Sequence, residues 1–235
     1  MGVHYDQPEK NEFVELPSYS ELAGQRSWKM HLIRIVTIGD TGSGKTALLR
    51  RYRTNDFNPK ECSGRSCEYK ASSVVIDKQK VKLQIWDFSG QEKYRTTSKV
   101  MYERTHGVVL MFSVADEESF LSLPKWLEDI KRNASSGCKV VLCANKTDLP
   151  KKEWKVSRGE FSKFAADNSL HLFETSASTG RNADVFMKFA IPVYRLMASK
   201  VIHENIRLYI FQRRSKVLII LHNSFFVHAG VNAVD

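Results

Sequence analysis

Short apolar runs alternate with segments of helical spacing along the middle of the chain. The runs are rich in β-branched residues and end at polar or glycine-rich loops, which predicts buried strands. The candidate strands are His31–Ile38, Cys67–Ile76, Lys80–Trp86, Gly107–Val114, Lys139–Ala144 and Leu170–Phe173. The candidate helices are Ala47–Tyr52, Glu117–Asn133, Ser157–Asn168 and a last helix that begins near Asn182. Strands that alternate with helices predict an α/β fold, with a mostly parallel six-stranded sheet covered by helices on both faces.

A single series of motifs lies within residues 30–199, which predicts one domain there. Residues 1–29 are polar, carry Pro8 and Pro17 and show no sustained period, so we expect a flexible N-terminal extension. Residues 200–235 form an atypical C-terminal tail, to which we return below.

A glycine-rich stretch links the first candidate strand to the first candidate helix. Its residues are Gly39, Asp40, Thr41, Gly42, Ser43, Gly44, Lys45 and Thr46, and Ala47 follows it. Between a strand and a helix, the spacing G-x-x-x-x-G-K-[ST] is typical of a phosphate-binding loop. The glycines allow backbone N–H groups to point at phosphate oxygens, Lys45 adds a positive charge, and Thr46 offers a hydroxyl to a magnesium ion. The alternative is a plain glycine-rich turn with an exposed lysine.

Three further polar loops follow candidate strands. Asp87–Glu92 (DFSGQE) comes after Lys80–Trp86, and Asn145–Asp148 (NKTD) comes after Lys139–Ala144. Glu174–Ser178 (ETSAS) comes after the last candidate strand. Ligands bind at the carboxyl ends of the strands in an open α/β sheet, so we expect these loops to lie near the phosphate loop.

In this order, the motifs resemble those of the Ras superfamily of small GTPases, and most closely its Rab branch. The segments that carry the resemblance, within His31–Ser199, are Gly39–Thr46, Leu83–Asp87 with Gly90–Glu92, Asn145–Asp148 and Thr175–Ala177. The resemblance implies the small-GTPase form of the P-loop NTPase fold, with GTP or GDP and Mg²⁺ as ligands. It further implies a molecular switch with slow GTP hydrolysis that regulates vesicle and membrane traffic. Effector, exchange-factor and activating proteins are the partners expected from the family.

Roles for residues near the phosphates also follow from the resemblance. Thr46 would bind Mg²⁺ directly, and Asp87 would hold it through a water molecule. The Gly90 N–H would sense the γ-phosphate, and Gln91 would orient the attacking water. The candidate catalytic residues are therefore Gln91 and Lys45.

The resemblance also implies a guanine site. The Asp148 carboxylate would accept hydrogen bonds from the guanine N1 and 2-amino groups, donors that adenine lacks. The loop therefore disfavours the alternative of a P-loop ATPase or kinase. The candidate base-binding residues are Phe57, Asn145, Lys146, Asp148, Ser176 and Ala177.

The first switch departs from the family pattern. Gly64 stands where small GTPases carry a threonine that binds magnesium. Glycine keeps the N–H but lacks the hydroxyl, which predicts weaker magnesium dependence and a poorly ordered first switch. Ser63 or Ser66 would supply the hydroxyl after a shift in register. Phe88 and Ser89 also replace usual family residues, so a hydrolysis-deficient GTP-binding scaffold or adaptor is the alternative function.

The C-terminal tail departs further. Rab proteins usually end in cysteines that accept prenyl groups, but the last cysteine here is Cys143, so no prenylation cysteine is seen. A basic cluster, Arg213–Lys216, precedes the apolar run Val217–Leu221. One interpretation is peripheral contact of residues 213–227 with an anionic membrane, and the other is an extra element packed on the domain. We expect a cytoplasmic protein. If residues 213–227 contact a membrane, we expect it to bind peripherally to an endomembrane.

Charge and cysteine content narrow the choice of partners. The net charge of +10 favours anionic partners such as a nucleotide or an acidic membrane. Because no platform of aromatic and basic residues and no recognition helix stands out, we expect no nucleic-acid partner. The cysteines lack the close spacing of a zinc site, which indicates reduced thiols.

Overall fold

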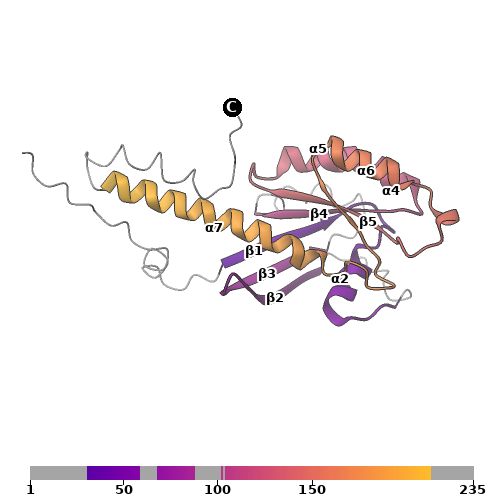
Figure 1. Ribbon diagram of the computed structural model, residues 1–235, viewed down its shortest axis with the longest axis horizontal. Helices are drawn as coiled ribbons and strands as arrows, with labels where there is room; N and C mark the ends of the chain where they lie inside the picture. The colour runs from indigo at the N-terminus through magenta and orange to yellow at the C-terminus, as the bar shows by residue number, and fades with distance from the viewer. Residues whose placement is uncertain (1–30, 59–67, 88–101, 103, 213–235) are drawn as a thin grey trace, which may run out of the picture. The chain divides into compact units, whose positions relative to one another are not determined.

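The computed structural model describes residues 31–58, 68–87, 102 and 104–212, with backbone alone at 68–70 and 201–212 (Figure 1). The chain divides into two compact units, Met30–Ile202 and a second unit composed of Met1–Lys29 and His203–Asp235. The second unit lies almost wholly outside the described residues, whereas Met30–Ile202 contains nearly all of them.

This unit is built on one six-stranded sheet with the strand order β2-β3-β1-β4-β5-β6. All neighbouring strands are parallel except the antiparallel pair β2–β3. The predicted α/β fold with a mostly parallel sheet is therefore confirmed. The elements in chain order are β1 His31–Ile38, α2 Lys45–Thr54, β2 Glu68–Ile76, β3 Gln79–Asp87, β4 Gly107–Ser113, α4 Glu117–Leu121, α5 Leu123–Asn133, β5 Lys139–Asn145, η2 Lys151–Glu153, α6 Arg158–Asp167, β6 His171–Glu174 and α7 Val185–Gln212.

The antiparallel pair is a tight hairpin. Asp77 and Lys78 form its turn with φ angles of 49° and 64°, the left-handed conformation that two-residue hairpin turns require. Along β3, Val81, Leu83 and Ile85 are buried while the residues between them are partly exposed. Apolar and polar side chains thus alternate along β3, and the apolar face meets the core.

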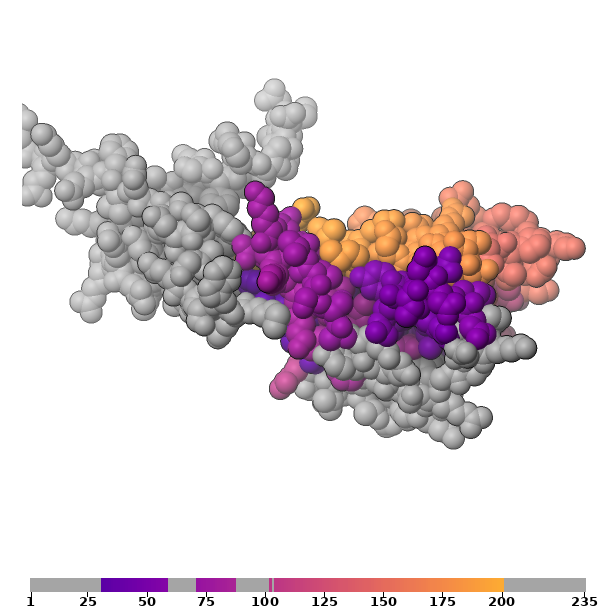
Figure 2. Space-filling view, turned by 90° about the horizontal axis from the view of Figure 1, so that it is seen from below, coloured from indigo at the N-terminus to yellow at the C-terminus, as the bar shows by residue number. Residues whose placement is uncertain are grey.

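Helices cover both faces of the sheet, as Figure 1 shows. One core cluster packs β1 and β3 side chains against α2 and α7, and a second packs β4 and β5 side chains against α4, α5 and α6. On the first face α2 lies beside α7 (Figure 2). The ring centroids of Tyr52 in α2 and Phe186 in α7 are 5.3 Å apart. Every residue of β4 is buried, because this strand lies in the middle of the sheet between the two layers. Within the described ranges, no helix has both the length and the apolar character needed to span a bilayer.

The helix predicted over Glu117–Asn133 is interrupted. It is divided into α4 and α5 at Ser122, two residues before Pro124. Proline has no backbone N–H, and its ring crowds the carbonyl four residues earlier, so a continuous helix through this point is unfavourable. The expectation of one helix was wrong for this local reason.

Candidate functional site

The phosphate loop joins the end of β1 to the beginning of α2. Gly39 and Gly44 have φ angles of 134° and 92°, a region that residues with a Cβ rarely adopt. A Cβ at Gly39 would overlap the Met111 carbonyl oxygen of β4, and a Cβ at Gly44 would overlap the side-chain amide of Asn145. The loop therefore needs glycine both for its backbone conformation and for its close packing against neighbouring strands.

The Lys45 side chain turns back over this loop. Its Nζ donates to the carbonyl oxygens of Gly39 and Asp40, each at 2.8 Å, and the residue is 4% exposed. Burial lowers the pKa of Lys45 to about 8, while the negative charges of Asp87 and Asp40 act in the opposite direction. A buried ammonium group on a glycine-rich loop can bind an anion such as a phosphate.

A hydroxyl and a carboxylate meet at the end of β3. Thr46 Oγ1 donates to Asp87 Oδ2 at 2.6 Å, and Thr37 Oγ1 donates to Asp87 Oδ1 at 3.3 Å. Asp87 is 2% exposed. Oxygen atoms of this kind are the ligands that Mg²⁺ prefers, so Thr46 and Asp87 fit a magnesium site. Among the described residues, no cluster of three or more His, Cys, Asp or Glu is present.

Asn145 connects three loops at the carboxyl end of β5. Its Nδ2 donates to the Ser43 carbonyl oxygen at 2.8 Å, and its Oδ1 accepts from Thr175 Oγ1 at 3.1 Å. Thr147 also donates to the Thr175 carbonyl oxygen, through Oγ1 at 3.0 Å and through its backbone N at 3.2 Å. These bonds bring the phosphate loop, the Asn145–Asp148 loop and the Glu174–Ser178 loop to one edge of the sheet.

The other described candidates surround this edge. Ser176 and Ala177 are buried, Lys146 is partly buried in a left-handed conformation, and Asp148 is exposed. Phe57 follows α2 and packs partly buried against the first core cluster. In the phosphate loop, Ser43 is buried, whereas Thr41 and Gly42 are exposed, and Ala47 is buried in the first turn of α2.

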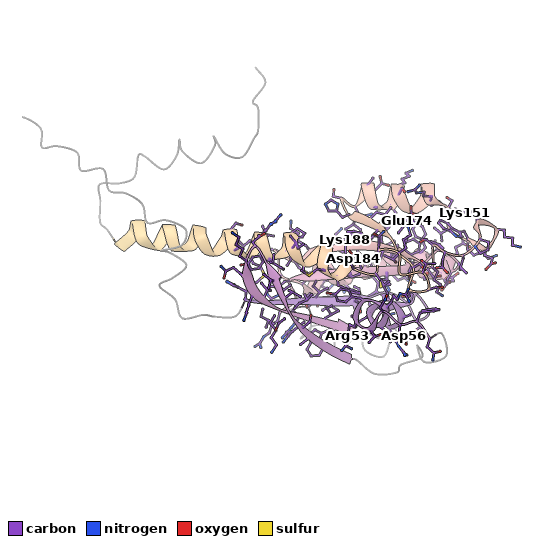
Figure 3. The ribbon with its side chains drawn as sticks, turned by 60° about the horizontal axis from the view of Figure 1, so that its bottom comes forward. Arg53, Asp56, Lys151, Glu174, Asp184 and Lys188 are labelled. Carbon is purple, nitrogen blue, oxygen red and sulfur yellow. The ribbon has the colours of Figure 1, made fainter. Side chains whose placement is uncertain are left out.

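Three contacts beside the site involve side chains that had no predicted role. The Glu174 carboxylate, labelled in Figure 3, is held by Arg158 at 2.6 Å and by Arg181 at 3.1 Å, and these ion pairs fasten the loop that carries Ser176. On the other side, Trp126 Nε1 of α5 donates to Asp40 Oδ1 at 2.8 Å. Trp126 and Asp40 are 86 residues apart, and the pairing of Glu174 with Arg158 and Arg181 depends on how their loops fold, so no local sequence signal identified these contacts.

Several predicted residues lie outside the described part of the chain. These are Gly90 and Gln91, the switch position Gly64 with Ser63 and Ser66, the pair Phe88 and Ser89, and the membrane candidate 213–227. Their roles stay predictions.

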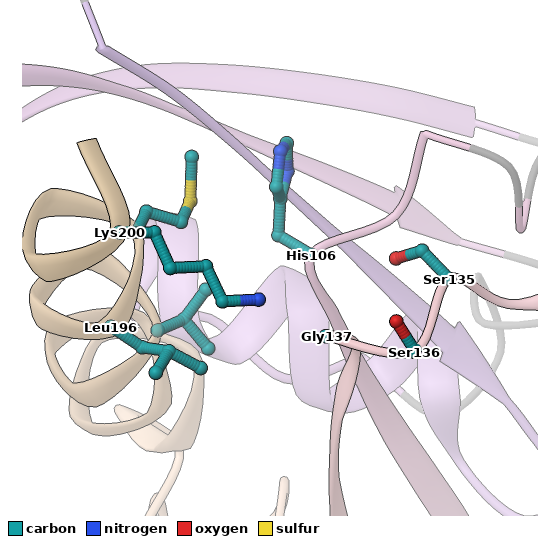
Figure 4. Close-up of a pocket in the computed structure, with 8 residues that line it drawn as sticks. His106, Ser135, Ser136, Gly137, Leu196 and Lys200 are labelled. Carbon is teal, nitrogen blue, oxygen red and sulfur yellow. The ribbon is translucent and has the colours of Figure 1, made fainter. Parts of the chain in front are cut away.

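A hollow of about 270 Å³ lies at the opposite edge of the sheet from these loops (Figure 4). It is lined by His106 before β4, by residues 135–137 and by side chains of α7 that include Leu196 and Lys200. Burial and the nearby Arg34 charge lower the pKa of His106. Because the strands β1, β4 and β5 are parallel, this edge is distant from the loops at their carboxyl ends, and the hollow contains none of the predicted site residues.

Comparison with known proteins gives a consistent result. The family model described as Ras family matches residues 34–194. The chain is 36% identical to Ras-related protein Rab-13 of Bos taurus over 154 residues, which is 66% of this chain and 75% of the relative. It is 34% identical to GTP-binding protein ypt3 of Schizosaccharomyces pombe over 171 residues, 72% of this chain and 79% of the relative. It is 36% identical to Ras-related protein Rab-15 of Homo sapiens over 151 residues, 64% of this chain and 71% of the relative.

Proposed function

Because this chain belongs to the Ras family, we propose that it is a GTP-binding molecular switch that hydrolyses GTP slowly and regulates membrane traffic as Rab proteins do. The observation that carries the proposal is the meeting of three loops through Asn145, which bonds to Ser43 and Thr175. The description of ypt3 as a GTP-binding protein supports the choice of nucleotide.

In this function, the phosphate loop binds the polyphosphate. Backbone N–H groups of the phosphate loop and of the α2 N-terminus would face the anion, and Lys45 would supply the positive charge for the outer phosphates. Thr46 and Asp87 would hold Mg²⁺, which neutralises charge on the phosphate oxygens. The short distance between their oxygens, 2.6 Å, supports this assignment.

The base is selected by the loops after β5 and β6. Asp148 is exposed at the rim, where its carboxylate can accept two hydrogen bonds from guanine. Ser176 and Ala177 contact the base from one side and Phe57 from the other. ATP lacks the donors that Asp148 requires, so GTP is expected to displace a fluorescent GDP and ATP is not.

Hydrolysis is assigned to Gln91, which orients the attacking water, with Lys45 stabilising the charge on the transferred phosphate. The test is single-turnover hydrolysis by protein loaded with GTP, with and without Mg²⁺. We expect slow, magnesium-dependent hydrolysis that Gln91→Leu reduces about tenfold or more. Gln79→Leu, the same substitution at the start of β3, is the control and is expected to leave the rate unchanged.

The outcomes separate the two functions weighed from the sequence. Tight GTP binding without hydrolysis in the wild type would favour a scaffold, in line with Gly64 at the switch position. No binding of GTP would contradict both functions.

Effectors, an exchange factor and an activating protein are proposed as partners on the strength of family membership. Contact of residues 213–227 with an acidic membrane is proposed from the basic and apolar composition of that segment. Binding to acidic vesicles that persists after deletion of residues 213–235 would contradict this contact.

A further inference from the structure

A hydrogen bond joins helix α5 to the phosphate loop across 86 residues of sequence. Trp126 Nε1 donates to Asp40 Oδ1 at 2.8 Å. The Trp126 side chain is 6% exposed and belongs to the core cluster beneath α4, α5 and α6. The donor is therefore held in place by the packing of the domain, and it determines the direction of the Asp40 carboxylate.

Asp40 is the one acidic residue among Gly39–Thr46. A carboxylate near bound phosphates is unfavourable, because like charges repel and the repulsion strengthens where water is excluded. Asp40 is also close enough to Lys45 for its charge to raise the pKa of that lysine against the effect of burial. A carboxylate free to rotate would compete with phosphate for the Lys45 ammonium.

The bond to Trp126 opposes that rotation. An indole N–H is a neutral donor, so it satisfies the carboxylate without adding a charge to the site. It directs Oδ1 toward α5, while the Asp40 carbonyl oxygen accepts from Lys45 Nζ at 2.8 Å. The side chain and the backbone of Asp40 are thus held by two different elements.

We propose that Trp126 is a positioning residue for nucleotide retention, which acts by holding the Asp40 carboxylate away from the phosphate site. This inference rests on the proposed function, because it requires a bound guanine nucleotide. It makes the position of α5 a determinant of how long the nucleotide stays bound.

The test measures release of a fluorescent GDP into excess unlabelled GDP, together with thermal unfolding of each variant. Trp126→Phe removes the donor and keeps an aromatic ring, and it is expected to accelerate release about tenfold. Adding Asp40→Asn to this variant removes the carboxylate charge but keeps its shape, and it is expected to return release to within about threefold of the wild type. Ile130→Val, one turn further along α5 in the same core cluster, is the packing control and is expected to leave release unchanged.

Each outcome has one meaning. Restoration by Asp40→Asn would support the inference, because a loss of packing at Trp126 cannot be repaired by a change of charge on the phosphate loop. Unchanged release in Trp126→Phe, or faster release that Asp40→Asn fails to slow, would overturn the inference and leave the proposed function intact. Failure of the wild-type protein to bind GDP would overturn the proposed function and this inference with it.

Discussion

At the scale of single residues, Asn145 joins two other loops by hydrogen bonds, in addition to its predicted place beside the base. Its side chain is 1% exposed and bonds to Ser43 on one side and to Thr175 on the other. A buried amide with its hydrogen bonds formed adds modestly to the free energy of unfolding. Removal of the amide costs more, because its buried partners are left without a hydrogen bond. Asn145 is therefore a structural connection between loops as well as a candidate ligand.

Asn145→Ala is expected to lower the free energy of unfolding by about 2 kcal/mol, because the Ser43 carbonyl and the Thr175 hydroxyl lose a buried partner. We expect GDP affinity to fall about tenfold as the loops lose their alignment. The measurements are urea unfolding of the nucleotide-free protein and equilibrium binding of labelled GDP.

The matched control is Asn133→Ala. Asn133 Nδ2 donates to the Asp129 carbonyl oxygen at 2.8 Å at the end of α5, distant from the loops. Loss of this hydrogen bond is expected to lower the free energy of unfolding by less than about 1 kcal/mol and to leave GDP binding unchanged. Equal effects of the two substitutions on GDP binding would contradict the connecting role of Asn145.

At the scale of elements, the fold depends on close packing of α7 against the central strand β4. A Cβ added to Gly107 would lie 2.6 Å from the Phe189 ring, too close for an ordinary contact. Phe189 is 4% exposed. The small residue on the strand and the large one on the helix are therefore matched in size.

Gly107→Ala alone is expected to destabilise the domain by about 2 kcal/mol through overpacking, and Phe189→Leu alone by about 1–2 kcal/mol through loss of volume. In the double variant the smaller side chain makes room for the added methyl group. Urea unfolding of the three variants is expected to show a combined loss smaller than the sum of the single losses. Simple additivity would show that the two side chains do not compete for the same space.

Local sequence patterns predicted single helices and strands better than they predicted contacts between them. The period of β3 and the turn at Asp77–Lys78 follow from side-chain alternation and turn chemistry within a few residues. The division of the predicted 117–133 helix was missed, although Pro124 carried the local signal for it.

At the scale of the whole molecule, the loops of the site are continuous with the sheet that supports them. Strands β3, β1, β4 and β5 are neighbours in this order and run parallel, so the loops that follow β1, β3 and β5 begin at the same edge of the sheet. A ligand that binds these loops in the folded state is therefore linked to the stability of the domain.

GDP at a thousand times its dissociation constant is expected to raise the free energy of unfolding by about 4 kcal/mol. Removal of Mg²⁺ with a chelator is expected to reduce this increment, because the ion that Thr46 and Asp87 are proposed to hold would no longer neutralise charge on the phosphates. Thermal unfolding with GDP, with GDP and chelator, and with ATP measures this linkage. A larger increment with ATP than with GDP would contradict guanine selectivity.

Residue patterns along the chain were sufficient to predict the class of fold and the loops of the candidate site. Periodicity, glycine spacing at Gly39–Thr46 and the NKTD loop are local patterns, and local patterns can be read without knowing which segments meet. The folded structure was needed to see that Asn145 bonds to Ser43, 102 residues away, and that Trp126 bonds to Asp40, 86 residues away. Such contacts depend on strand order and on how helices cover the sheet, and any indole or amide in the chain has the chemistry to make them.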